Sequence, residues 1–260
     1  MRSLARVPWL GLGVVVLGLV AWELVARSRE ELAAFFPPVS EVLVTLAQIL
    51  WSGELMAHIA ASLRRFAEGY ALAGVLAVSA GLCLGIWRPL YRVFEPLIEL
   101  LRPMPSPATI PIAILFLGIG DEMKIAVIVY ACAWPILLNT IDGVRSVDRV
   151  LVATAATFRL SRWARFWKVM LPAASPQIVT GLRVSLAIAL ILVTTSEMVV
   201  SNDGLGFYVL ERQRSFEMPE MYAAIVTLAL IGYGLNRLFL ALDGWAMAWH
   251  KGLTRKEEIL

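Results

Sequence analysis

Polar side chains near the end of an apolar run are the first residues that could do chemistry. Glu197 follows Thr194, Thr195 and Ser196 in such a run. An ionisable group inside a membrane is costly to bury, so these four residues are candidates for the wall of a solute path. The alternatives are a glutamate at a helix end that reaches water and threonines that bond back to their own helix. Both interpretations stay open at this point.

Asn139 and a group of prolines form the second set of candidates. Asn139 could face a solute path or could make a helix–helix hydrogen bond worth about 0.6 kcal/mol, and we favour the bond. Irregular backbone at membrane depth needs shelter from protein or a cavity. We therefore expect the proline-rich stretch to face a dimer interior or the path, with a surface loop at the inner membrane edge as the alternative. Its prolines are Pro103, Pro105, Pro107 and Pro111.

Catalytic, metal and nucleotide chemistry have little support in this sequence. His58 and His250 both lie outside the apolar runs, which argues against a Ser–His dyad or a histidine metal site within a membrane. Cys83 and Cys132 have neither metal-site nor disulfide spacing, and we expect buried free thiols. The chain has no G-x-x-x-x-G-K-[ST] motif. We expect no catalytic residue, metal or cofactor on this chain, so an ATP-driven process would need a second polypeptide.

The composition indicates whether water or lipid surrounds the segments that contain these residues. Of the 260 residues, 59% are hydrophobic and 17% are charged. Soluble domains have about 45–50% apolar and about 25% charged residues. The mean hydropathy of +0.75 agrees with this difference. The sequence therefore predicts an all-α integral membrane protein rather than a single water-soluble core.

Six apolar stretches approach the roughly 20 residues that cross a bilayer, and we predict six transmembrane helices. A signal peptide is the alternative for the first, but that stretch is longer than a signal h-region and ends in "ELVARSREE", so we favour an anchor helix. "EPLIELLRPMPSPATIP" would give the third, short stretch a broken helical entry. The stretches are 7–26, 66–87, 108–120, 125–141, 178–200 and 222–242.

The distribution of basic residues predicts the orientation in the membrane. With the N-terminus in the cytoplasm, 14 of the 23 Lys and Arg residues fall in cytoplasmic segments and 7 on the opposite side. This bias places both termini inside. We expect an amphipathic element at 35–55 and a loop at 201–220 on the outer face. The predicted organisation is a peripheral helix with an outer segment (1–62), a five-helix core (63–245) with a cytoplasmic loop (142–177), and a cytoplasmic tail (246–260).

The cytoplasmic loop contains a two-faced helical pattern. Its aromatic residues follow i, i+3, i+4 spacing, with three cations on the opposite face. Ser161 is a good N-cap, and proline bars the helix from continuing past Leu171 without a kink. We expect a helix at the inner membrane surface, preceded by a short helix at 147–158, and the alternative is an ordinary structured loop. The membrane-surface residues are Trp163, Phe166, Trp167, Leu171 and Pro172.

This loop resembles the cytoplasmic loop of ABC importer permeases, whose pattern is Glu-Ala-Ala, three residues, Gly, nine residues, Ile, one residue, Leu-Pro. With Leu171-Pro172 as the anchor, Val169 takes the Ile place and Arg159 the Gly place. Residues 153–155 then take the Glu-Ala-Ala place, and residues 154–156 would need a one-residue deletion. The glutamate and glycine are both missing. Because a left-handed non-Gly residue costs about 1–2 kcal/mol, we expect a turn of different shape.

The resemblance extends through "LPAASPQIVTGLRV" and "SEMVVSNDGLGFYVL" and covers most of residues 35–222. On this basis the chain resembles permeases of the nitrate/sulfonate/taurine importer group. The resemblance implies a type I importer permease fold and a homodimer in the bacterial inner membrane, with the first helix peripheral and five helices lining the path. The loop would dock on a separate ATP-binding subunit, present in two copies, through Ala153, Thr154, Ala155, Ala156, Thr157, Phe158, Arg159 and Leu160.

The resemblance also implies the remaining partners. ATP–Mg would be bound by the ATP-binding subunit, membrane lipid would surround the helices, and no nucleic acid is involved. An extracytoplasmic binding protein would deliver a small anion, such as nitrate, bicarbonate or a sulfonate, or a vitamin precursor; the sequence does not select among them. The alternative function is a stand-alone secondary transporter, which predicts inverted repeats and buried acidic residues. We find no convincing repeat in the sequence.

Overall fold

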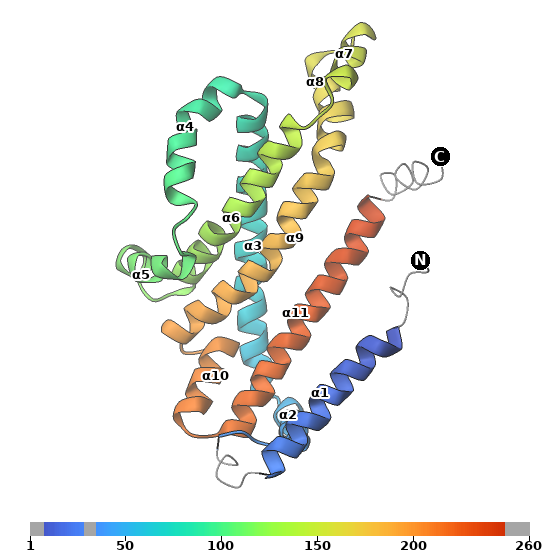
Figure 1. Cartoon of the computed structure of the whole chain (residues 1–260). Helices are drawn as coiled ribbons and strands as arrows, with labels where there is room; N and C mark the ends of the chain where they lie inside the picture. Colours follow the sequence, from blue (N-terminus) through green and yellow to red (C-terminus); the bar gives the residue numbers. More distant parts are fainter. Residues whose placement is uncertain (1–7, 29–34, 248–260) are drawn as a thin grey trace.

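The computed structural model describes residues 8–28 and 35–247, and these residues form helices and turns without a strand (Figure 1). The helices are α1 (Pro8–Ser28), α2 (Val39–Trp51), α3 (Glu54–Ile86), α4 (Arg88–Leu101), η3 (Ser106–Thr109), α5 (Ile110–Leu117), α6 (Asp121–Arg145), α7 (Arg149–Thr157), α8 (Arg162–Arg165), η4 (Phe166–Met170), α9 (Leu171–Val199), α10 (Leu205–Arg214) and α11 (Met218–Ala246). Among them η3 is a 3₁₀-helix and η4 a π-helix. The predicted all-α membrane class is confirmed.

The length and hydropathy of the helices determine how many of them can span a membrane. Within residues 8–28 and 35–247, four helices are long and apolar enough to cross a bilayer: Glu54–Ile86, Asp121–Arg145, Arg162–Val199 and Met218–Trp245. The bent pair Arg88–Leu101 and Ser106–Leu117, with an angle of 93°, would make a fifth. This pair has the broken entry that we expected from its prolines. The 21-residue helix α1 is not among the four, so six spans remain a prediction.

Close contact between α3, α6 and α9 forms the centre of the bundle. Small residues recur every fourth position along α3, at Gly69, Ala73, Ala77, Gly81 and Gly85, and all five are buried. A Cβ atom on Gly81 would lie 2.6 Å from Cβ of Thr140 on α6. On α9, a Cβ atom on Gly181 would lie 2.9 Å from the backbone oxygen of Pro135. Glycine therefore lets the backbones approach closely enough to pack in a solvent of lipid tails.

The bent pair folds back along α6. The Arg145 guanidinium, at the end of α6, lies 3.7 Å from the ring centroid of Tyr91 on α4. The hydroxyl of Tyr130, near the middle of α6, donates to the carbonyl of Leu101 at 3.1 Å. The end of α4 therefore lies beside the middle of α6.

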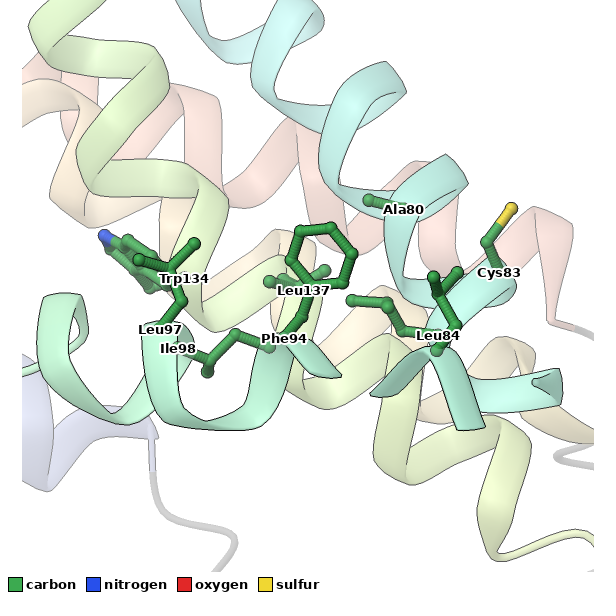
Figure 2. Close-up of a pocket in the computed structure, with 9 residues that line it drawn as sticks. Ala80, Cys83, Leu84, Phe94, Leu97, Ile98, Trp134 and Leu137 are labelled. Atoms are coloured by element: carbon green, nitrogen blue, oxygen red, sulfur yellow. The ribbon is translucent and has the colours of Figure 1, made fainter. Parts of the chain in front are cut away.

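An apolar hollow of about 350 Å³ separates α4 from α3 and α6 (Figure 2). Phe94 and Leu97 of α4 line it together with Trp134 of α6. Cys83 also lines this hollow and is exposed, so the expectation of a buried thiol is wrong for Cys83 and confirmed for Cys132. The hydropathy of the run around Cys83 indicates membrane, but it does not indicate which side of the helix meets protein.

The outer segments are helical. Residues 35–55 contain the expected amphipathic element, α2, which buries Val42, Leu46 and Ile49 against α10 and α11. The stretch 201–220, which we expected to be a loop, contains the ten-residue helix α10. Its buried residues Leu205, Tyr208 and Val209 follow helical spacing, but they lie among polar residues that obscure the pattern.

The substitution Gly81→Ala tests the close packing of α3 and α6. Its methyl group would overlap Thr140, so we expect a loss of about 1–3 kcal/mol in the free energy of unfolding. Gly74→Ala is the matched control, because its Cβ atom would meet only Leu182 Cδ2 at 3.5 Å. Thermal unfolding of both variants in detergent measures the difference. Equal unfolding temperatures for the two variants would contradict this packing.

Candidate functional site

The loop at 142–177, which we expect to lie on the inner side of the membrane, contains a small, well-capped helix, α7. The Asp148 carboxylate accepts a hydrogen bond from the Val150 amide at 2.8 Å, which caps the start of α7. At the other end Arg159 has φ 53, in the left-handed region. Its amide donates to the Ala156 carbonyl at 2.9 Å, and the Leu160 amide donates to the Ala155 carbonyl at 3.2 Å. These two bonds form the Schellman motif that ends many helices.

The expectation of a turn with a different shape is therefore wrong. Arg159 adopts the left-handed conformation that glycine usually takes, at a cost of about 1–2 kcal/mol. The two hydrogen bonds of the motif offset part of this cost, because they satisfy carbonyl groups that would otherwise face water. We call α7 together with the turn 158–161 the inner knob.

The helix after the inner knob begins at the predicted N-cap, but it does not end where we expected. Ser161 Oγ accepts from the Ala164 amide at 3.2 Å and caps α8, which confirms the predicted N-cap. The helix does not end at Leu171, since α8, η4 and α9 follow one another as a single helix from Arg162 to Val199. The π-turn explains this continuity. The Leu171 amide donates to the Phe166 carbonyl, and the wider turn accommodates the Pro172 ring and its missing N–H.

The aromatic segment is thus part of a membrane-spanning helix rather than a separate surface helix. At 38 residues this helix is about 57 Å long, whereas a bilayer with its headgroups measures about 40–45 Å. The expected aromatic face is present, because ring centroids of Trp163, Phe166 and Trp167 lie 5.3–6.2 Å apart. The inner knob is therefore followed directly by the helix that contains α9.

The inner knob exposes apolar side chains. Phe158 at its tip is 77% exposed and Val150 is 69% exposed. Both line a hollow of about 410 Å³, together with Leu160 and Val169, and the buried Ala155 also contributes to its lining. Of the predicted docking residues, Ala153, Thr154, Ala156 and Thr157 are exposed. Exposed apolar residues beside a hollow at the polar end of a membrane protein are typical of a protein-binding surface.

The hydroxyl and amide candidates of the solute path bond within their own helices. Thr194 and Thr195 donate to the carbonyls of Leu190 and Ile191 at 2.8 and 2.7 Å, as the structural alternative predicted. Ser196 is buried and donates to Val193. The Asn139 amide donates to the Pro135 carbonyl at 2.8 Å, so the favoured helix–helix bond is wrong: the bond lies within α6.

Glu197 lies at the centre of a buried polar cluster. It is 1% exposed and accepts hydrogen bonds from Ser62 Oγ at 2.8 Å, Arg65 Nη1 at 2.9 Å and the Gly206 amide at 3.0 Å. Of the two interpretations left open for Glu197, the alternative of a carboxylate that reaches water is therefore wrong. The side chain also has no open surface in the protomer through which it could touch a solute.

Arg65 joins this cluster to three segments of the chain. Its side chain is buried, and its Nε donates to Asp121 Oδ1 of α6 at 2.7 Å. Its Nη2 pairs with the Asp203 carboxylate, in the turn between α9 and α10. We call Arg65, Asp121, Glu197 and Asp203 the outer ion cluster. The Arg65 guanidinium, through its hydrogen bond, lowers the pKa of the Asp203 carboxyl.

Sequence analysis missed the outer ion cluster because its members lie far apart in the chain. Arg65 is separated from Glu197 by 132 residues and from Asp203 by 138. One signal was available: Arg64 and Arg65 form a charged pair directly before an apolar run. His58 contributes nearby, where its Nδ1 accepts from the Gly204 amide at 3.1 Å. Among the described residues, no three His, Cys, Asp or Glu side chains form a group that could hold a metal ion.

Substitution of Arg65 tests the outer ion cluster. Arg65→Gln would leave the buried Glu197 without its cationic partner, and we expect the free energy of unfolding to fall by about 3–5 kcal/mol. Arg64→Gln is the matched control, because Arg64 pairs with Asp121 from an exposed position, where such a pair contributes at most about 1 kcal/mol. Thermal unfolding in detergent distinguishes the two, and a similar loss in both variants would contradict a buried cluster.

Known proteins with similar sequences identify the family of this chain. A model of the family described as "Binding-protein-dependent transport system inner membrane component" matches residues 72–246. A probable ABC transporter permease of Brucella abortus is 32% identical over 249 residues, which cover 95% of this chain and 98% of the relative. The taurine transport system permease protein TauC of Escherichia coli is 31% identical over 252 residues, covering 95% and 92%.

A further relative and a solved structure extend this likeness. The bicarbonate transport system permease protein CmpB of Synechococcus elongatus is 31% identical over 188 residues, covering 72% of this chain and 68% of the relative. The inward-facing MetNI methionine ABC transporter has a chain with the same fold, with a TM-score of 0.62 and 19% identity, covering 75% of this chain and 96% of that one. The chain therefore belongs to the family of binding-protein-dependent transport system inner membrane components, the permeases of ABC transporters.

Proposed function

We propose that this permease forms the translocation path of an ATP-driven importer and that its inner knob docks on a separate ATP-binding subunit. The observation that carries the proposal is the exposed apolar surface of the inner knob, next to a helix that continues without interruption into the membrane. In this mechanism the other subunit binds ATP–Mg and hydrolyses ATP. Two copies of the permease and two ATP-binding subunits make up the assembly.

The structure of the inner knob suits a mechanical role. Phe158 and Val150 would enter a groove of the ATP-binding subunit, as the two most exposed apolar side chains of α7 and its turn. The Asp148 cap and the Schellman turn satisfy the backbone groups at both ends of α7, so the knob can move as a rigid unit. Because α8 and α9 form one helix, force applied to the knob would reach the membrane core.

The organisation predicted from the sequence is part of the proposal. Residues 63–245 form the permease core, residues 1–62 a peripheral part, and residues 246–260 a cytoplasmic tail. Both termini lie in the cytoplasm of a bacterial cell and the chain crosses the inner membrane. Among the path candidates, Asn139, Thr194 and Thr195 are half-buried and remain candidates, whereas Ser196 and Glu197 are fully buried.

The proposed solute is a small anion that an extracytoplasmic binding protein delivers to the outer end. Relatives of this chain are named for transport of taurine and bicarbonate. Another is the nitrate import permease protein NrtB of Leptolyngbya laminosa. Each of these solutes carries an anionic group. The binding protein selects among these anions. The outer surface formed by α2 and α10 would bind that binding protein.

Substitution of Phe158 tests the docking role. In the assembled importer, Phe158→Asp would place a charge in the apolar contact, so we expect ATPase co-purification and transport-coupled ATP hydrolysis to fall at least tenfold. Phe158→Leu is the matched control, since it keeps an apolar side chain at the same exposed position. Membrane insertion and unfolding temperature should be unchanged in both variants.

Three outcomes would contradict the proposed function. Unchanged co-purification of the ATP-binding subunit with Phe158→Asp would exclude the inner knob as its dock. Solute uptake by the chain alone in liposomes, without any ATP-binding subunit, would support a secondary transporter instead. Labelling of Arg162→Cys by a reagent added outside intact cells would place the inner knob on the wrong side of the membrane.

The solute class can be tested on the binding protein encoded with this permease. We expect nitrate, bicarbonate or a small sulfonate to raise its unfolding temperature in a thermal-shift assay, with an uncharged sugar of similar size as the control. Stabilisation only by uncharged or cationic compounds would contradict an anionic solute and leave the docking role unaffected.

A further inference from the structure

Five charged residues of α4 and its end lie along one side of the helix. They are spaced alternately by four and three residues, which at about 100° per residue places them within a sector of roughly 80°. All five are exposed in the protomer. The five, which we call the charged stripe, are Arg88, Arg92, Glu95, Glu99 and Arg102.

The charged stripe lies at membrane depth. Tyr91, near the start of α4, contacts Arg145 at the end of α6, and Leu101, at the end of α4, bonds to Tyr130 in the middle of α6. The 15 residues between these two contacts on α6 correspond to about 22 Å along a helix that is long and apolar enough to span the membrane. Since the hydrocarbon core is about 30 Å thick, most of the stripe lies inside it.

The other sides of α4 already have suitable neighbours. Ile98 is buried against Leu84 of α3 and Ile141 of α6. Val93 and Leu100 are 73% and 69% exposed, on a sector roughly opposite the packed side, and their apolar side chains suit lipid tails. The charged stripe lies between these two sectors and suits neither a protein core nor lipid.

Contacts within the described part of the chain do not neutralise the stripe. Its one ion pair there is weak, with 3.9 Å between Arg102 Nη1 and Glu99 Oε1 in exposed positions. Towards the inner end, Arg88, Arg92 and Glu95 line a polar hollow of about 230 Å³ together with Tyr91 and Arg145. Charges at this depth face water or one another, because contact with lipid is costly.

We propose that the charged stripe forms a wall of the water-filled path and offers its guanidinium groups to the anionic group of a passing solute. This inference rests on the proposed function, since it assumes a second copy on the far side of the path. In a two-fold dimer with its axis along the membrane normal, each stripe residue would face its own copy. Direct contact would therefore oppose like charges, whereas a water-filled gap separates them.

The charge of the stripe favours anions. Each copy contributes three arginines and two glutamates, so two copies give a wall of net charge about +2. Arg88 and Arg92 lie at the start of α4 and Arg102 at its end, with Glu95 and Glu99 between them, so an anion would meet guanidinium groups at both ends of the stripe and no single tight site. Exposed side chains also bind more weakly than buried ones, which suits transport.

Cysteine labelling of the full-length permease in open membrane fragments tests the proposal. In a Cys83→Ala background, Glu95→Cys and Glu99→Cys should react with a membrane-impermeant sulfonate-bearing methanethiosulfonate. Val93→Cys and Leu100→Cys are the matched controls, because they lie at similar depth on the lipid side, and we expect them to react at least tenfold more slowly. Phe158→Cys, on the inner knob, reports full exposure to water.

A second reagent tests the preference for anions. At Glu99→Cys, the sulfonate reagent should react several-fold faster than a quaternary-ammonium methanethiosulfonate, when both rates are divided by those at Phe158→Cys. The additional substitution Arg102→Gln should reduce this ratio. An equal or inverted ratio would overturn the proposed preference of the charged stripe for anions.

The remaining outcomes decide the position of the stripe. If stripe cysteines do not react but form oxidative cross-links between copies, the face is a closed dimer contact and the proposal is wrong. If stripe and lipid-side cysteines react equally fast, α4 lies outside the bilayer and the proposal is also wrong. Labelling needs no ATP-binding subunit, so these results are independent of the Phe158→Asp test of the proposed function.

Discussion

Close backbone contact between α3, α6 and α9 is the constraint on which the rest of this structure depends. In lipid, burial of apolar surface does not hold helices together, because the surrounding tails are as apolar as the side chains. Packing must come from proximity, and Gly81 and Gly181 allow α6 to approach both neighbours closely. The three helices therefore form a rigid centre. The inner knob, the outer ion cluster and α4 are all positioned relative to that centre.

The two ends of this three-helix centre differ in the interactions that stabilise them. At the outer end, Arg65 pairs with carboxylates from α6, α9 and the turn after α9; Arg65 and Glu197 are buried, whereas Asp121 and Asp203 are partly exposed. Burial of charge is costly unless every partner is present, so such a cluster specifies one arrangement of the three segments. At the inner end, the contacts of α7 are local caps and an exposed apolar surface. One end is fixed by ion pairs within the chain, and the other exposes the surface to which our proposal assigns a partner.

Every polar group in the membrane segments needs a hydrogen-bonding partner. Uncharged and charged side chains meet this need in different ways. Thr194, Thr195 and Asn139 satisfy their polar groups on carbonyls of their own helices. The charged stripe has no such solution, because guanidinium and carboxylate groups are too large and too strongly hydrated to be satisfied by one backbone carbonyl. For charges at that depth, water is the natural neighbour, and α4 is the helix that can bring it into the protomer.

The amino-acid sequence was sufficient to predict the membrane class, four helices that can span the membrane, the bent entry near Pro103, the Ser161 cap and the family resemblance. These depend on composition, periodicity and local spacing, which a single segment contains. Tertiary structure alone decided that Glu197 is buried on Arg65, that Cys83 is exposed, that α8 continues into α9 and that α4 lies beside the middle of α6. The burial of Glu197, the exposure of Cys83 and the position of α4 depend on which side of a helix meets another segment, and no local pattern contains that information. The continuation of α8 depends on the π-turn before Pro172, which the proline by itself does not predict.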